Sequence, residues 1–144
     1  MSKSQSFENH TKIVPLYHGF VLVVFGVNVV SAVLNLVRAP SVAAGVAALV
    51  AVALVLAALY ARVFALAVQD RVIRLEMRLR LRDVLPADQQ ATIPQFSVGQ
   101  LVAMRFASDE ELPALAATVL RDNVKDKKTI KKMIKNWLAD HQRA

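Results

Sequence analysis

The chain has 144 residues and a net charge of +7, so it has room for one membrane unit and one small folded unit. It contains no cysteine, which excludes disulfides, thiolate metal sites and a cysteine nucleophile. Residues 42–61 carry no charge, whereas most of the charged side chains lie in residues 70–144, and this separation is typical of a membrane protein with a polar tail.

The first predicted element is a membrane-spanning helix over about residues 14–37, after a polar segment at residues 1–12. A bilayer core requires about 20 helical residues, and this apolar run is long enough to cross it. The apolar region of a cleaved signal peptide is shorter, about 7–15 residues, so we expect a retained anchor.

A short loop over residues 38–41 is predicted to join this helix to a second one. Pro40 cannot continue a helix, and Ser41 is a suitable N-cap for the helix that follows. The second apolar run spans about residues 42–62 and contains one glycine, Gly45, after which neither Gly nor Pro occurs before Pro86. We therefore predict one long helix from about Val42 to about Val84, which leaves the membrane and continues into water.

Lysine and arginine placement predicts the orientation of this hairpin, residues 13–69, because cytoplasmic flanks of bacterial membrane proteins are enriched in these residues. The loop carries only Arg38, whereas six arginines follow the second span between Arg62 and Arg82. Both termini are thus expected in the cytoplasm, with residues 70–144 forming a cytoplasmic basic helical domain. A basic excess beside membrane helices favours anionic lipids as a partner, and no nucleic acid is expected.

Inside a membrane, helices associate through close packing of small residues and through interhelical hydrogen bonds. Each span carries a stripe of residues spaced alternately four and three positions apart, which places them on one face of a helix. Because the two helices run antiparallel, the first residues of one stripe would meet the last residues of the other. The predicted hairpin interface consists of Tyr17, Asn28, Ser31 and Asn35 on the first helix and Ala44, Ala48, Ala51 and Arg62 on the second. The polar members would either hold the helices together or line a track for a solute, and we favour the first role.

A further ladder of small residues, Ala53, Ala57, Ala61 and Ala65, lies on another face of the second helix. It indicates either a homo-oligomer contact or merely an alanine-rich helix.

Beyond the second span, four arginines share one face of the predicted helix, namely Arg71, Arg74, Arg78 and Arg82. They would either stay solvated while the helix packs against the tail or contact anionic lipid head groups. Capping-box spacings at Ser97 and Ser108 predict helices through about Arg105 and about Arg121.

A last helix is predicted from Asp126 or Thr129 to about Ala139. Its candidate lipid or partner contacts are Lys128, Lys131, Lys132, Lys135 and Trp137, which with the apolar residues between them predict a basic amphipathic helix. Three roles remain open for it: packing on the other tail helices, lying on the inner leaflet with Trp137 as anchor, or binding an acidic partner.

No pattern of a catalytic site is visible in the chain, so we predict that it is not an enzyme and needs no cofactor. A minor alternative is a metal-binding or enzymatic protein that uses His10 and His18, although their spacing is a weak metal signal.

Several segments resemble an uncharacterised family of small bacterial two-span membrane proteins. They read QSFENH at residues 5–10, PLYH at 15–18, LVAMRFASDEELP at 101–113 and IKKMIKNW at 130–137. The family is known only as a domain of unknown function, so the resemblance implies a bacterial inner-membrane location and two spans but no activity.

The predicted fold is all-α, a two-helix transmembrane hairpin with a small cytoplasmic helical domain. The function that we favour is that of a non-enzymatic scaffold, accessory or regulatory subunit that acts on a protein partner through its tail. The alternative is a membrane-surface module that responds to anionic lipids.

Overall fold

The computed structural model describes residues 6–7 and 14–140, and the regular elements among these residues are helices, with no β-strand. In chain order the elements are the π-helical turn η1 (Leu16–Val21), α1 (Leu22–Arg38), α2 (Val42–Val84), the 3-10 helix η2 (Gln90–Gln95), α3 (Val98–Met104), α4 (Leu112–Arg121) and α5 (Lys127–Met133). The described residues divide into a helix pair that ends at Leu66 and a folded domain that begins at Ala67. Helix α2 contributes to both units because it continues without a break, as the sequence predicts.

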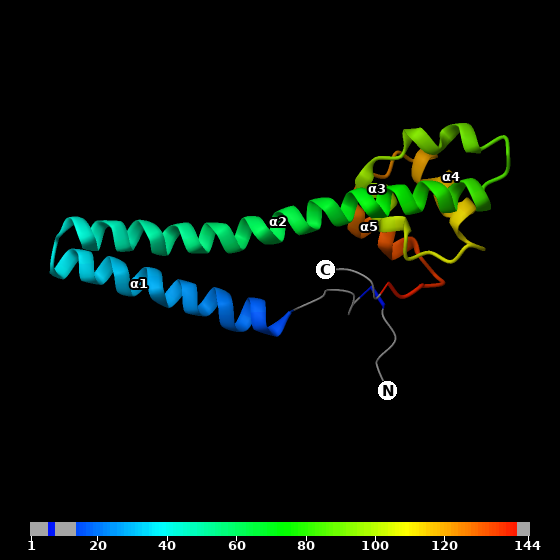
Figure 1. Ribbon diagram of the computed structural model, residues 1–144. Helices are drawn as coiled ribbons and strands as arrows, with labels where there is room; N and C mark the ends of the chain where they lie inside the picture. The colour runs from blue at the N-terminus through cyan, green and yellow to red at the C-terminus, as the bar shows by residue number, and fades with distance from the viewer. Residues whose placement is uncertain (1–5, 8–13, 141–144) are drawn as a thin grey trace. The chain divides into compact units, whose positions relative to one another are not determined.

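In the helix pair, α1 and the first part of α2 run antiparallel on either side of a tight turn at Ala39 and Pro40 (Figure 1). Ser41 caps α2, since its Oγ accepts a hydrogen bond from the Ala44 amide at 3.1 Å. The turn thus uses the two residue types that the sequence offers for it, a proline that ends one helix and a serine that begins the next.

A π-helical turn precedes α1, and the Leu22 amide accordingly donates to the carbonyl of Tyr17, five residues earlier. The Tyr17 hydroxyl donates a hydrogen bond to the Ala58 carbonyl of α2 at 2.5 Å. This contact joins the open ends of the two helices one turn of α2 before Arg62, the residue that the reversed stripes place opposite Tyr17, and the direct meeting of these two side chains stays a prediction.

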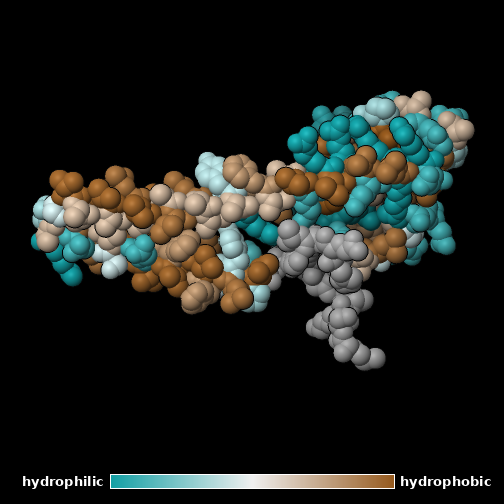
Figure 2. All heavy atoms as spheres, viewed as in Figure 1, coloured by the Kyte–Doolittle hydropathy of each residue, from teal (hydrophilic) through white to brown (hydrophobic). Residues whose placement is uncertain are grey.

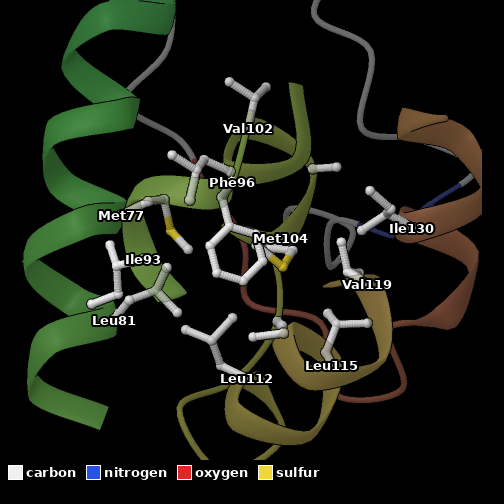
Figure 3. Packing of buried hydrophobic residues seen from close by; sticks show 14 of the residues in the cluster. Met77, Leu81, Ile93, Phe96, Val102, Met104, Leu112, Leu115, Val119 and Ile130 are labelled. Atoms are coloured by element: carbon white, nitrogen blue, oxygen red, sulfur yellow. The ribbon is translucent and has the colours of Figure 1, made fainter. Parts of the chain in front are cut away.

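The core of the folded domain forms where α2 carries charged residues on one side and apolar residues on the other. Ile73, Met77 and Leu81 are buried at helical spacing on one face of α2, and Leu85 is buried directly after its end. Figure 3 shows Met77 and Leu81 pointing toward Phe96, Met104 and Leu112 from the later elements. Burying a large aliphatic side chain contributes about 1.5–3 kcal/mol, so these contacts stabilise the domain against its ordering entropy.

Helix α3 begins as the sequence predicts. The Ser97 side chain accepts from the Gln100 amide, and the Gln100 side chain accepts from the Ser97 amide. The side-chain nitrogen Nε2 of buried Gln100 also donates to the Val124 carbonyl at 2.9 Å. The capping box therefore ties α3 to the segment that precedes α5.

Three boundaries in the domain differ from the prediction. Helix α4 begins at Leu112 rather than at Ser108, because Pro113 fits best in the first turn of a helix, where its missing amide is tolerated. The 3-10 helix η2 had no sequence signal beyond its proline. Helix α5 is capped by Asp126 but ends at Met133, well before the predicted end near Ala139.

Candidate interaction surfaces

The predicted polar face of α1 does not lie in the helix pair's interior. Asn28, Ser31 and Asn35 are exposed, which corrects the prediction that they form the hairpin interface. The half-buried side chains from this part of the chain are instead Tyr17, Val21, Leu22, Phe25, Val29, Ala32 and Leu36.

The π-helical turn explains this correction. A π-turn contains one residue more than an α-turn, so every later residue is displaced along the helix surface by one position. Tyr17 keeps its inward place, whereas Phe25, Val29 and Ala32 occupy the positions predicted for Val24, Asn28 and Ser31.

On α2, the predicted interface residues lie on the inner side of the helix pair. Ala44 and Ala51 are buried, and Ala48 and Arg62 are half-buried. Alanines at these positions allow the two backbones to approach closely. The ladder Ala53, Ala57, Ala61 and Ala65 is exposed in the structure.

The outer surface of the helix pair is strongly apolar, as the brown side chains over α1 and the first half of α2 show (Figure 2). The stretches Leu16–Arg38 and Val42–Val84 are long and apolar enough to cross a membrane. In the most apolar 18 residues of each stretch, 0% and 11% of the residues, respectively, are buried. Core helices of soluble proteins bury such surfaces, whereas these two helices leave theirs uncovered.

The Arg stripe predicted on α2 lies mostly at the surface of the folded domain. Arg71, Arg74 and Arg82 are exposed, and Arg78 is half-buried. The three exposed guanidinium groups are therefore accessible to solvent, whereas the Nε atom of Arg78 is buried.

Sequence reasoning missed Arg80, which is the most extensively bonded arginine in the described residues. Its guanidinium donates to the Ala107 carbonyl at 2.6 Å, to the Arg105 carbonyl at 3.0 Å and to the Asp109 carboxylate at 2.6 Å. It satisfies carbonyl groups just beyond the end of α3, where the helix leaves acceptors without intrahelical donors. From the sequence alone, the contact visible for Arg80 is the one with Glu76, four residues earlier on the same helix.

The chain after α5 packs back onto residues 106–111. Ala107 and Trp137 form an isolated antiparallel bridge, in which the Leu138 amide donates to the Phe106 carbonyl at 2.7 Å. The Trp137 ring stacks on Phe106 with 4.4 Å between the ring centroids. Trp137 is thus half-buried and lies beyond the end of α5, which corrects its predicted place on the last helix, whereas its role as a lipid or partner contact stays a prediction.

Acid–base contacts hold the same closing segment. One carboxylate oxygen of Glu111 accepts from the amides of Lys135 and Asn136, both at 3.1 Å. Arg105 bonds Asp140 at 2.8 Å and lies over the Phe106 ring. These contacts explain why α5 stops early, because residues after Met133 are extended to reach this junction.

The lysines of the tail divide into two groups. Lys128, Lys132 and Lys135 are exposed, whereas Lys131 is half-buried with its ammonium over the Phe106 ring, 5.2 Å from the centroid.

Beside α5, the Thr129 hydrogen bond to Asp126 lowers the pKa of that carboxyl. Similarly, the hydrogen bond from Arg121 lowers the pKa of Asp122.

The described part of the chain gives little support to a metal or catalytic site that uses His10 and His18. His18 Nδ1 lies 3.0 Å from the Val14 carbonyl and 3.2 Å from the Val14 amide, and His10 lies outside the described residues. No group of three or more His, Asp or Glu residues there is arranged to hold a metal ion.

The model of the family of unknown function named DUF6526 matches residues 1–144, the whole chain. The chain belongs to the DUF6526 family. No curated protein and no solved structure matches it. Two segments through which the sequence resembles its family, residues 101–113 and 130–137, form the junction around Phe106 and Trp137 in this DUF6526 structure.

Proposed function

We propose that this DUF6526 protein is an integral membrane protein that displays a folded helical domain on a continuous helix and acts as a non-enzymatic scaffold, accessory or regulatory subunit. In this proposal α1 and the first part of α2 span a bacterial inner membrane as a hairpin. The domain that begins at Ala67 lies in the cytoplasm and provides the surface for a protein partner.

The observation that carries the proposal is the change of surface along α2. Its first part exposes large apolar residues such as Leu49 and Val50, whereas its last part buries Met77 and Leu81 in a core and exposes arginines. Apolar surface of the first kind is stable in hydrocarbon, and a charged surface with a dry core is stable in water. One uninterrupted helix therefore suits both solvents in turn.

The membrane location and orientation are tested with single-cysteine variants, since the native chain contains no cysteine. Ala39→Cys places a thiol in the exposed turn of the helix pair, and Asp88→Cys places one on the folded domain. A membrane-impermeant maleimide should label the first variant in intact spheroplasts and the second only after permeabilisation. The opposite pattern would reverse the orientation, and labelling of both in intact spheroplasts would refute a cytoplasmic domain.

The scaffold role is tested by affinity purification from native membranes in mild detergent, followed by mass spectrometry. Deleting residues 125–144 is a poor control, because it removes the buried core residue Ile130. A charge reversal at exposed Lys128 and Lys135 keeps the core, and Lys132 is left in place because its ammonium lies 5.8 Å from the centroid of the Phe7 ring. Recovery of a partner with the native chain and its loss with the reversed chain would support the scaffold role, and equal recovery would move the contact elsewhere.

A second candidate is a membrane-surface module that contacts anionic lipids, and the exposed Lys127, Lys128 and Lys132 of α5 support it. A basic residue near an anionic surface contributes about 1 kcal/mol, and salt screens the interaction. The folded domain of the purified protein should then resist protease in anionic liposomes at low salt, but it should be cleaved in neutral liposomes. Equal protease sensitivity in both would leave the scaffold role.

A further inference from the structure

The folded domain leaves an apolar stripe of α2 uncovered. Val68, Val72, Leu75 and Leu79 are between 49% and 61% exposed, although they belong to a helix whose other face builds the core. Hydrophobic side chains follow α2 across the surface of the domain in Figure 2. The steps between the four residues are 4, 3 and 4, which is the heptad spacing of a coiled-coil seam.

The seam can be written in heptad positions. Val72 and Leu79 take position a, and Val68 and Leu75 take position d. A β-branched residue at a followed by leucine at d, as at Val72 and Leu75, favours two-stranded coiled coils. The core residues Ile73 and Met77 fall at other positions, so the seam and the core do not compete for the same side chains.

The charges that flank the seam are complementary in one arrangement only. Arg71 and Arg78 take position g, and Glu76 and Asp83 take position e. In a parallel pair each g residue meets the e residue five positions later in the other chain, so Arg71 meets Glu76 and Arg78 meets Asp83. An antiparallel pair would instead bring arginine to arginine and carboxylate to carboxylate. Within the described residues, none of these four side chains forms an ion pair of its own.

We propose that this stripe is the contact surface for a second copy of the same chain, which it binds as a short parallel coiled coil. The seam is short, but it lies inside a 43-residue helix, so association does not require helix nucleation. The parallel orientation rests on the proposed membrane function, because two copies inserted in the same sense align their α2 helices in the same direction. Confinement to one membrane also raises their effective concentration.

Disulfide crosslinking of the full chain in native membranes tests the contact. Leu75→Cys puts the only thiol at a seam position, and Arg74→Cys puts it at an exposed position outside the seam on the same helix. Under mild oxidation the first variant should give covalent dimers and the second should not. Equal crosslinking of both variants, or an adduct with a different protein, would overturn the proposal.

Charge exchange tests the pairing and its direction. Arg71→Glu alone places like charges at the g–e contact, and because the symmetric dimer contains the contact twice, self-association should weaken roughly three- to thirtyfold. Glu76→Arg alone should have a similar effect, and the double variant should recover most of the native affinity. Fluorescence energy transfer between labelled full-length chains in liposomes measures these changes, and a double variant as weak as the singles would refute the parallel pairing.

Two controls keep the result interpretable. The Trp137 emission and the far-ultraviolet circular dichroism of each variant should match those of the native protein, because all substituted side chains are exposed. Carbonate extraction of membranes is measured on the same variants. Seam-specific dimers of a protein that carbonate removes would refute the membrane function while keeping the dimer, whereas an integral protein without such dimers would refute the dimer alone.

Discussion

Arg80 offers a direct test of how the folded domain is held to α2. Its guanidinium is the donor for two backbone carbonyls, those of Arg105 and Ala107, and its side chain is 23% exposed. Arg80→Met keeps a long apolar stem but removes every donor. A hydrogen bond from a charged donor contributes about 1.5–3 kcal/mol, and the carbonyls left without it lose a partner in a partly buried site.

The ion pair with Asp109 adds little, because that carboxylate is 63% exposed and such pairs contribute about 0–1 kcal/mol. We therefore expect Arg80→Met to lower the free energy of unfolding of the domain by about 2–4 kcal/mol, since the contributions of neighbouring bonds are not fully additive. Asp109→Asn should lower it by less than about 1 kcal/mol.

Urea unfolding of the full chain in detergent micelles measures these differences. The single tryptophan, Trp137, stacks on Phe106 beside the two carbonyls and reports on the junction directly. Arg82→Met is the matched control, because Arg82 is exposed on the same helix and should change stability by less than about 0.5 kcal/mol. If Arg80→Met behaved like this control, or no worse than Asp109→Asn, the carbonyl contacts would not be what stabilises the junction.

Three further predictions concern other parts of the molecule. Leu81→Ala should destabilise the domain by about 2–5 kcal/mol in the same urea assay, because Leu81 is fully buried, and a loss under 1 kcal/mol would contradict the described core. Tyr17→Phe removes the hydroxyl that donates to the Ala58 carbonyl and should weaken the helix pair by about 0.5–1.5 kcal/mol, which a shift in gel migration of the hairpin or faster protease cleavage near the turn would report. The lowered pKa of Asp126 stabilises the folded state above its unfolded pKa of about 3.9, and that contribution disappears as the pH falls through the folded pKa. Native stability should therefore decrease relative to Asp126→Asn between pH 5 and pH 2, and a constant difference would show that the cap does not depend on charge.

Several features were predicted from sequence because local chemistry determines them. The absence of Gly and Pro between Gly45 and Pro86 predicts the long helix α2, and Pro40 with Ser41 predicts the turn that precedes it. Ser97 and Gln100 predict the start of α3 because a capping box needs only residues within one turn. The extent of apolar surface on the first two helices follows equally from composition.

Other features depend on contacts between residues distant in sequence. The extended end of the chain at Trp137 arises from pairing with Ala107, and thirty residues separate the two positions. Lysines and apolar residues near Trp137 have helical spacing, so local propensity alone favours a longer α5. Stacking on Phe106 and the carboxylate of Glu111 override that propensity.

The sequence by itself determined the number, type and approximate bounds of the long helices, since periodicity, proline and capping residues act within a few positions of one another. Only the tertiary structure decided which face each helix turns inward. On α1 a single π-helical turn moved the packed face by one residue and left Asn28 and Asn35 exposed. On α2 the folding of the later helices placed the Arg105 and Ala107 carbonyls, just beyond the end of α3, within hydrogen-bond distance of Arg80.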